Sequence, residues 1–127
     1  MWNLLLGAGG RLAVVDWESA RSDGWPLSDF LYATTDAAAA CDGYRERDTA
    51  FLSCFASDGS HAPAVTSMQA HVARALDLTP AAAELCQHAC WLEHAANEQR
   101  SSAHSAERPF LRILERLATR ADASAHG

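Results

Sequence analysis

The sequence contains no lysine. All ten basic side chains are arginines, and sixteen acidic side chains outnumber them, which gives a formal net charge of −6 and a pI near 5.4. Because nucleic-acid-binding proteins generally carry a basic surface, this balance argues against general nucleic-acid binding. A long apolar run is also missing, since the amino-terminal leucines follow no basic region and their run breaks at Gly7. We therefore expect no signal peptide, no membrane span and a cytoplasmic protein.

Common catalytic motifs are absent as well. The sequence has no Gly-x-Ser-x-Gly, no Walker loop and no His-Glu-x-x-His. Its six histidines are scattered, without a serine or cysteine partner that would make a nucleophile. A hydrolase interpretation therefore has no support. The four cysteines are Cys41, Cys54, Cys86 and Cys90. Their number is even, but without secretion we expect free thiols.

The amino-terminal segment predicts a short β-hairpin. Asn3 is followed by three leucines, a loop of four small residues at 7–10 and an apolar run at 12–15 that ends at Asp16. The hairpin would bring Asn3 and Asp16 to the same end, where an amide oxygen beside a carboxylate suits Mg²⁺. The alternative is that Asn3 caps a turn and that Asp16 only ends a strand.

Three pieces of this segment, 2–5 (WNLL), 12–18 (LAVVDWE) and 26–30 (PLSDF), occur in order at suitable spacing. Together they resemble the aminoglycoside phosphotransferase and choline kinase-like family. In that family a His-Gly-Asp catalytic loop runs on to an Asn, a hairpin follows, and an Asp in an Ile/Val-Asp-Trp/Phe-Glu context closes it. The resemblance covers about the first quarter of the chain and implies a protein kinase-like fold.

The resemblance also implies roles for individual residues. Asn3 and Asp16 would be the Mg²⁺ ligands that hold the metal on ATP. Asp29 matches a carboxylate that is mainly structural and braces the catalytic loop from the start of the next helix. Glu18 fits the pattern at the edge of the site, with a less defined role. The implied activity is ATP-dependent, Mg²⁺-assisted transfer of a phosphoryl group to a hydroxyl of a small molecule.

The chain lacks the catalytic base of the family that it resembles. The catalytic Asp should lie about five positions before Asn3, and no His-Gly-Asp occurs in the sequence. The strands that cover the nucleotide and the phosphate-pairing lysine are missing too. We therefore expect the carboxy-terminal part of a phosphotransferase, truncated by a misplaced start, a split gene or decay, with no catalytic base of its own and inactive alone. The alternative is a non-catalytic helical interaction module, in which self-association or a missing amino-terminal part covers exposed apolar surface.

Beyond the hairpin the sequence predicts about five helices, at 27–40, 44–55, 64–76, 80–99 and 107–121, with breaks at 41–43, 57–63 and 101–105. The expected fold class is mainly α, with an α+β parent fold: a kinase-like carboxy-terminal lobe in a single domain at 1–121 and a disordered tail at 122–127. The helix at 80–99 is apolar on two sides. Leu85, Ala89, Leu92 and Ala96 share one face, and Trp91 lies nearly opposite. Such a helix is usually sandwiched between others or has one face at an interface.

Two further patterns have both a functional and a structural interpretation. Three zinc-type ligands are spaced by four residues along one helix: Cys86, Cys90 and His94. They rise about 12 Å along the helix axis, so only an adjacent pair could share an ion. Buried free cysteines are the commoner case. Arginines at 108, 112, 116 and 120 could bind phosphate, or could form a solvated helix face.

The sequence leaves the phosphoryl acceptor open. In the family that this chain resembles, substrate choice resides largely in the helical region and its loops. Aminoglycosides, choline, amino sugars and other alcohols all remain candidate acceptors.

Overall fold

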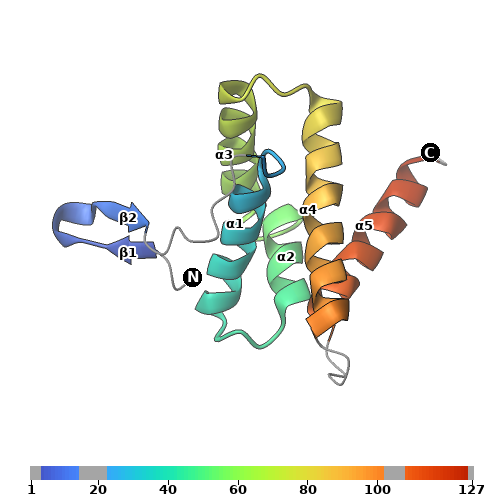
Figure 1. Ribbon diagram of the computed structural model, residues 1–127, viewed down its shortest axis with the longest axis horizontal. Coiled ribbons are helices and arrows are strands. Elements are labelled where there is room, and N and C mark those ends of the chain that lie inside the picture. The colour runs from blue at the N-terminus through green and yellow to red at the C-terminus, as the bar shows by residue number, and fades with distance from the viewer. Residues whose placement is uncertain (1–3, 15–22, 102–107, 126–127) are drawn as a thin grey trace.

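The computed structural model describes residues 4–14, 23–101 and 108–125. Most of the described chain is helical, which confirms the prediction of a mainly helical fold (Figure 1). The elements, in chain order, are β1 (Leu4–Leu6), a 3-10 turn (Ala8–Gly10), β2 (Leu12–Val14), α1 (Ser28–Cys41), α2 (Arg47–Phe55), α3 (Ala62–Ala75), α4 (Pro80–Ser101) and α5 (Pro109–Ala125).

The two strands pair antiparallel with each other. Leu4 lies opposite Val14, and Leu6 lies opposite Leu12. Gly9 in the connecting turn has φ 75°, a left-handed conformation that glycine adopts at little cost. Figure 1 shows this hairpin to one side of the helices. The residues of its connection, 7–11, are exposed.

The end of α1 is fixed by a Schellman motif. The Tyr44 N–H donates to the carbonyl of Ala39 at 2.7 Å, and the Gly43 N–H donates to the carbonyl of Ala40 at 3.1 Å. The predicted break at 41–43 is therefore confirmed. The predicted start of the next helix at Tyr44 is wrong, because Tyr44 takes part in this motif with φ 57° and α2 begins only at Arg47.

The start of α4 follows its sequence signal. The hydroxyl of Thr79 accepts a hydrogen bond from the backbone N–H of Ala82 at 3.2 Å. Pro80 occupies the first helical position, where a backbone N–H has no partner within the helix, so the lack of one in proline costs no hydrogen bond. The predicted threonine cap and proline first turn are confirmed.

The start of α5 is capped from another helix. The carboxylate of Glu98 on α4 accepts hydrogen bonds from the backbone N–H of Leu111 at 3.1 Å and of Phe110 at 3.4 Å. These two N–H groups belong to the first turn, where no partner exists within the helix. The sequence predicted a helix over 107–121; the structure has it from Pro109 to Ala125.

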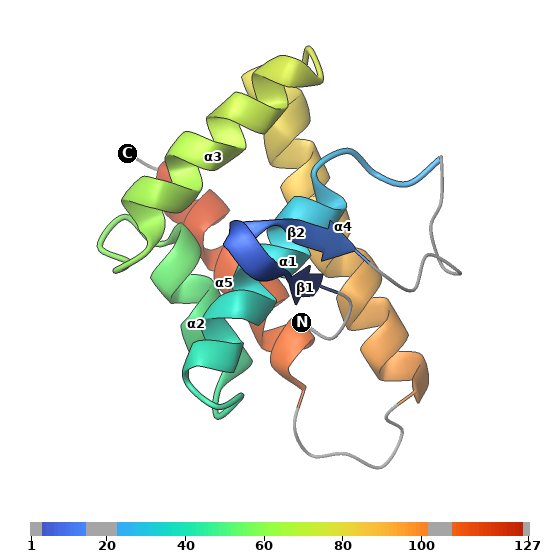
Figure 2. The same cartoon turned by 90° about the vertical axis from the view of Figure 1, so that its left-hand side faces the viewer.

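The main core lies where α1, α2, α4 and α5 meet, and Figure 2 shows these four helices around it. Trp91 and Phe51 are fully buried and pack edge to face, with ring centres 5.5 Å apart. The other buried members of this cluster are Leu27, Leu31, Cys86, Cys90, Ile113 and Leu117. A smaller cluster joins α3 to α1 and α2 through Ala38, Ala39, Ala50, Cys54 and Val65. Within the described residues, no helix has the length and apolar character that crossing a membrane requires.

Candidate functional site

Three of the predicted site residues, Asn3, Asp16 and Glu18, lie outside the residues that the structure describes. The strand positions beside two of them are described. Leu4 follows Asn3 in the chain, Val14 precedes Asp16 by two positions, and Leu4 and Val14 are paired. The start of β1 and the end of β2 therefore lie at the same end of the hairpin.

The first residues of α1 are held in place by contacts with α4. Leu27 is buried and has φ 66°, an uncommon conformation for a residue with a branched side chain. The thiol of Cys90 donates a hydrogen bond to the carbonyl of Ser28 at 3.7 Å. Burial raises the pKa of the Cys90 thiol, and the nearby carboxylates of Glu93 and Asp29 raise it further. The thiol therefore stays protonated at neutral pH and can keep this bond.

Asp29, the fourth predicted site residue, lies in the first turn of α1 and is exposed. A carboxylate there is favoured by the positive end of the helix dipole. Among the described residues its side chain makes no hydrogen bond or ion pair. The role that the resemblance implies for Asp29, to brace a catalytic loop, stays a prediction.

A junction of charge and aromatic rings, which sequence reasoning missed, surrounds Arg47. The guanidinium of Arg47 lies 3.1 Å from the buried carboxylate of Asp36, and it donates to the hydroxyl of Tyr32 at 3.3 Å. Its central carbon lies 5.1 Å from the ring centre of Phe110 and 5.8 Å from those of Tyr32 and Tyr44. The rings and the carboxylate offset the desolvation of this half-buried cation. Arg47 therefore connects α1, α2 and α5.

His94 lies in the same junction. Its ring stacks on Tyr32, with ring centres 4.5 Å apart, and on Phe110 at 5.1 Å. Burial lowers the pKa of His94; the guanidinium of Arg47 lowers it further, and the carboxylate of Glu93 acts in the opposite direction. His94 thus serves as a neutral aromatic spacer between α1 and α5, and we find no acid-base partner for it in the described part of the chain.

Asp48 forms a second charged contact, between α2 and α5. Its carboxylate is buried and lies 3.7 Å from the guanidinium of Arg112 and 3.9 Å from that of Arg116. Its Oδ1 has no hydrogen-bond partner among the described residues, so the attraction is mainly coulombic. Arg108 donates instead to Gln99 at 2.9 Å. Three of the four predicted arginines therefore bind side chains of this protein, which favours the structural interpretation of that strip over a phosphate site.

The cysteines are free thiols; Cys41 is exposed, whereas Cys54, Cys86 and Cys90 are buried. In the described residues, no three His, Cys, Asp or Glu side chains are grouped closely enough to hold a metal ion. Cys86 and Cys90 face the main core, where Cys90 donates to Ser28. Their described contacts are those of small core residues.

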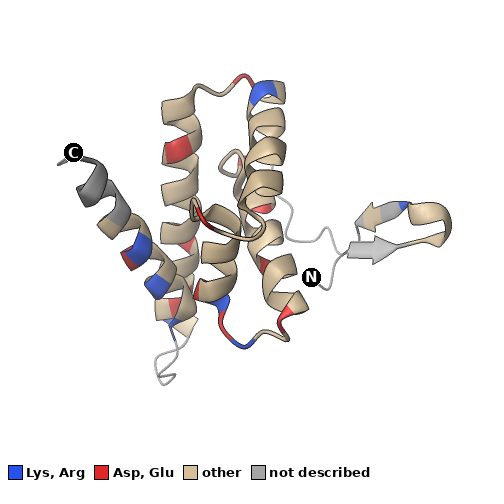
Figure 3. Cartoon of the chain, turned by 180° about the vertical axis from the view of Figure 1, so that it is seen from behind, with Lys and Arg blue, Asp and Glu red and all other residues tan. Residues whose placement is uncertain are grey.

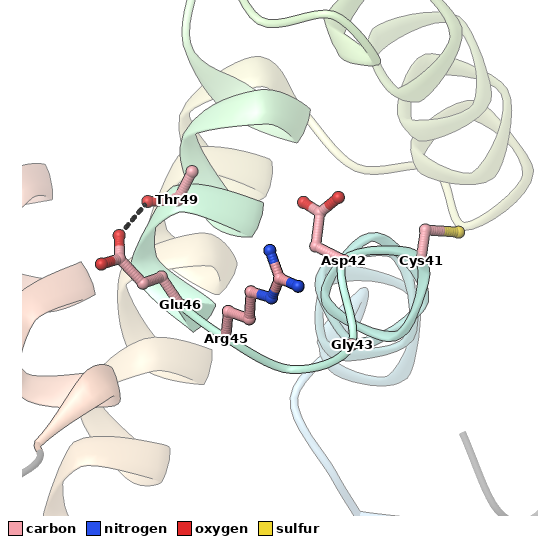
Figure 4. Close-up of a pocket in the computed structure, with 6 residues that line it drawn as sticks. All are labelled: Cys41, Asp42, Gly43, Arg45, Glu46 and Thr49. Atoms are coloured by element: carbon pink, nitrogen blue, oxygen red, sulfur yellow. Dashed lines mark hydrogen bonds between the residues drawn. The ribbon is translucent and has the colours of Figure 1, made fainter.

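An open depression of about 700 Å³ lies at the turn between α1 and α2 (Figure 4). Asp42 and Arg45 point into it, and Thr49 donates a hydrogen bond to Glu46 at its rim at 2.9 Å. The side chain of Cys41 points away. The residues that line the depression carry both signs of charge and include none of the predicted site residues. The depression therefore does not extend the predicted metal site.

The junction residues had a signal in the sequence. Asp36 is four residues after Tyr32, and Asp48 is three before Phe51, so each carboxylate occupies a helix position that faces the core. A buried carboxylate requires a cationic or hydrogen-bonding partner. That requirement could have identified both aspartates, although it could not have named Arg47 or Arg112 as the partners.

Comparisons of the chain with protein-family models, with curated proteins and with solved structures found no match.

Proposed function

We propose that this chain is the carboxy-terminal part of an ATP-dependent, Mg²⁺-assisted phosphotransferase that acts on a hydroxyl group of a small molecule. The observation that carries the proposal is the occurrence, in order, of the three motif pieces at 2–5, 12–18 and 26–30. In this proposal Asn3 and Asp16 bind Mg²⁺ against the ATP phosphates, and Asp29 supports the site from the start of α1.

The pairing of the described strands supports the proposed metal site. Because Leu4 is paired with Val14, the two strand ends next to Asn3 and Asp16 in the sequence lie together. One amide oxygen and one carboxylate are a small protein ligand set. Mg²⁺ accepts such a set because it completes its octahedral shell with water and phosphate oxygens.

The fourth residue of the proposed site, Asp29, lies on the helical part of the structure. Leu27 anchors the entry to α1 in the main core, and Cys90 holds the carbonyl of Ser28. Asp29, the next residue, thereby gains a fixed backbone position at the surface. A kinase-like carboxy-terminal lobe would use its first helix in the same way.

The proposed chemistry is divided between this chain and residues outside it. The 127 residues contain no His-Gly-Asp and no lysine, so the base that accepts the substrate proton and the lysine that pairs with ATP phosphates must come from elsewhere. Loss of a general base alone lowers a rate by about 10² to 10⁴. We therefore expect the isolated chain to bind Mg²⁺ and ATP weakly and to transfer no phosphate at a measurable rate.

Calorimetric titration of the purified chain with ATP in the presence of Mg²⁺ tests the proposal. Asp16→Asn keeps the shape of the side chain and removes its charge. Asp58→Asn makes the same change at an exposed loop position between α2 and α3. We expect binding by the unmodified chain and by Asp58→Asn, and a loss of about tenfold or more in Asp16→Asn. No binding by the folded chain, or equal binding by both variants, would contradict the proposal.

A second candidate function is a non-catalytic helical interaction module. One observation favours it: the side chains of Leu85 and Leu92 on α4 are 63% and 57% exposed. Large apolar side chains exposed together on one helix face mark a surface for another protein element. Nucleotide binding separates the two functions, since the module requires none.

A further inference from the structure

The start of α5 is attached to α4 by one carboxylate and one imidazole. Glu98 accepts hydrogen bonds from the first backbone N–H groups of α5. One turn earlier on α4, the ring of His94 lies between two aromatic rings, that of Tyr32 on α1 at 4.5 Å and that of Phe110 on α5 at 5.1 Å between ring centres. Figure 3 shows charged positions of both signs where the first half of α5 lies against α4 and α2. The packing of α5 therefore depends on groups whose charge can change.

Among the described residues, α5 has fewer buried anchors than its neighbours. It contributes Ile113 and Leu117 to the main core. α4 contributes Cys86, Cys90 and Trp91 to the same core, and α1 and α2 also take part in the smaller cluster with α3. A helix with few buried contacts opens locally at a lower cost than the rest of a fold. We therefore expect a change at the start of α5 to displace α5 and to leave the other helices in place.

Positive charges lie near His94 on two neighbouring helices. The central carbon of the Arg47 guanidinium on α2 is 5.1 Å from the ring centre of Phe110, the ring on which His94 also stacks. The first turn of α5 presents the positive end of its helix dipole to α4. α5 also carries Arg108 and Arg112, each of which is bound to another side chain. A proton on His94 would therefore add a positive charge beside others of the same sign.

The carboxylates near His94 are engaged elsewhere or are exposed. Asp36 on α1 lies 3.1 Å from the guanidinium of Arg47, and Glu98 on α4 binds the start of α5. Glu93, the residue before His94, is exposed and favours a charged imidazole only through its proximity. Within the described part of the chain, the ring of His94 makes no hydrogen bond or ion pair. While α5 is docked, a protonated His94 thus has no carboxylate in contact with it there.

We propose that protonation of His94 releases α5 from the other helices, which makes α5 a pH-controlled element of this fold. When α5 leaves, water reaches His94, the positive end of α5 moves away, and the carboxylate of Glu98 loses its N–H partners. Residues four apart on a helix are neighbours, so Glu98 then pairs with the imidazolium of His94. The proton therefore binds the released state more tightly than the docked state, which is the condition for shifting the equilibrium between them.

The direction of the pH response follows from the surroundings of the ring. Burial lowers the pKa of His94 in the docked state, and Arg47 lowers it further. The ordinary value of about 6.5 applies once the side chain is in water, so release is favoured as the pH falls below that value. Release uncovers the apolar side chains of Ile113 and Leu117 together with Trp91, on which α5 packs. The inference concerns only the helices and does not depend on the phosphotransferase proposal.

Hydrogen exchange of the full chain at about pH 7.5 and pH 5.5, on the two sides of the ordinary histidine value, tests the release. After correction for the intrinsic exchange rates, we expect the protection of the α5 amides to fall at the lower pH by roughly fivefold or more relative to that of the α2 amides. His94→Phe keeps an aromatic ring and removes the titration, so α5 should keep its protection in this variant. His71→Phe makes the same change at an exposed position of α3 and should behave as the unmodified chain does.

An NMR titration of the unmodified chain gives a second test that requires no folded variant. The backbone signals of α5 should change with the same midpoint as the ring signals of His94, and that midpoint should differ from the one of His71. Protection that does not fall at low pH, that falls equally in all helices, or that falls as much in His94→Phe would overturn the inference. Different midpoints for α5 and His94 would overturn it as well.

Discussion

β1 and β2 of this protein pair with each other, and their connection at 7–11 is exposed. The helices, by contrast, surround a core in which Trp91, Phe51 and Ile113 have no exposed surface. The residues predicted to bind metal adjoin the hairpin, whereas the residues that hold the fold together lie on the helices. We therefore expect substitutions at the proposed metal ligands to leave the stability of the helical core largely unchanged.

The largest expected effect comes from the core. Trp91→Ala should lower the free energy of unfolding by about 3–5 kcal/mol, because it leaves a cavity where α2, α4 and α5 meet. Leu92→Ala, at the next position of the same helix but 57% exposed, should cost less than about 0.5 kcal/mol. Urea denaturation measures both. Equal losses would show that the two sides of α4 are not distinct.

Asp48 tests the charged contact between α2 and α5. Asp48→Asn removes the charge that attracts Arg112 and Arg116, and we expect a loss of about 1–2 kcal/mol in unfolding free energy. Asp58→Asn, on an exposed loop, is the matched control and should change little. Thermal denaturation of both variants decides the point. A loss for Asp58→Asn as large as that for Asp48→Asn would contradict a specific role for Asp48.

His94 gives the helical part a pH dependence. Its pKa is lowered in the folded protein, mainly by burial and also by Arg47, whereas the unfolded chain has the ordinary value of about 6.5. Below that value the unfolded state binds more protons than the folded state, so stability falls as pH decreases. His94→Phe should remove this part of the pH dependence of the melting temperature. An unchanged pH profile in the variant would show that His94 is not its source.

The sequence predicted the helices well where their signals are local. Thr79 and Pro80 start α4 as expected, and the Schellman motif at Gly43 and Tyr44 ends α1 at the predicted break. The start of α5 could not be placed from the sequence, since its first N–H groups are satisfied by Glu98 from a different helix. The local pattern contains no information about which carboxylate reaches them.

The same limit applies to the candidate site. The motif order could be read from residues 2–30, and so could the hairpin end at which Asn3 and Asp16 were expected. The junction around Arg47 could not, because its contacts join α1 and α2 to α5, which follows in the chain only after α3 and α4. Likewise, the two apolar sides of α4 are evident from periodicity, but only the packing of Trp91 shows which one faces the core.

The smallest effect on stability is expected at the predicted metal ligand. Asp16→Asn should change the unfolding free energy of the helical part by less than about 0.5 kcal/mol in the absence of metal, because the proposed role of Asp16 is to bind metal and not to stabilise the helices. Far-ultraviolet circular dichroism during urea denaturation measures it. A loss as large as that of Trp91→Ala would mean that the separation between the two regions does not hold.

The most direct test of the proposed metal site uses Mn²⁺, an oxygen-binding substitute for Mg²⁺ that broadens nearby NMR signals. With ATP and Mn²⁺ added at substoichiometric amounts, the backbone signals of Leu4 and Val14 should broaden before those of α4 and α5, and Asp16→Asn should abolish this preference while Asp58→Asn retains it. Broadening that first affects the acidic residues of the helices, or that is the same in the Asp16→Asn variant, would contradict a nucleotide-linked metal site at the hairpin.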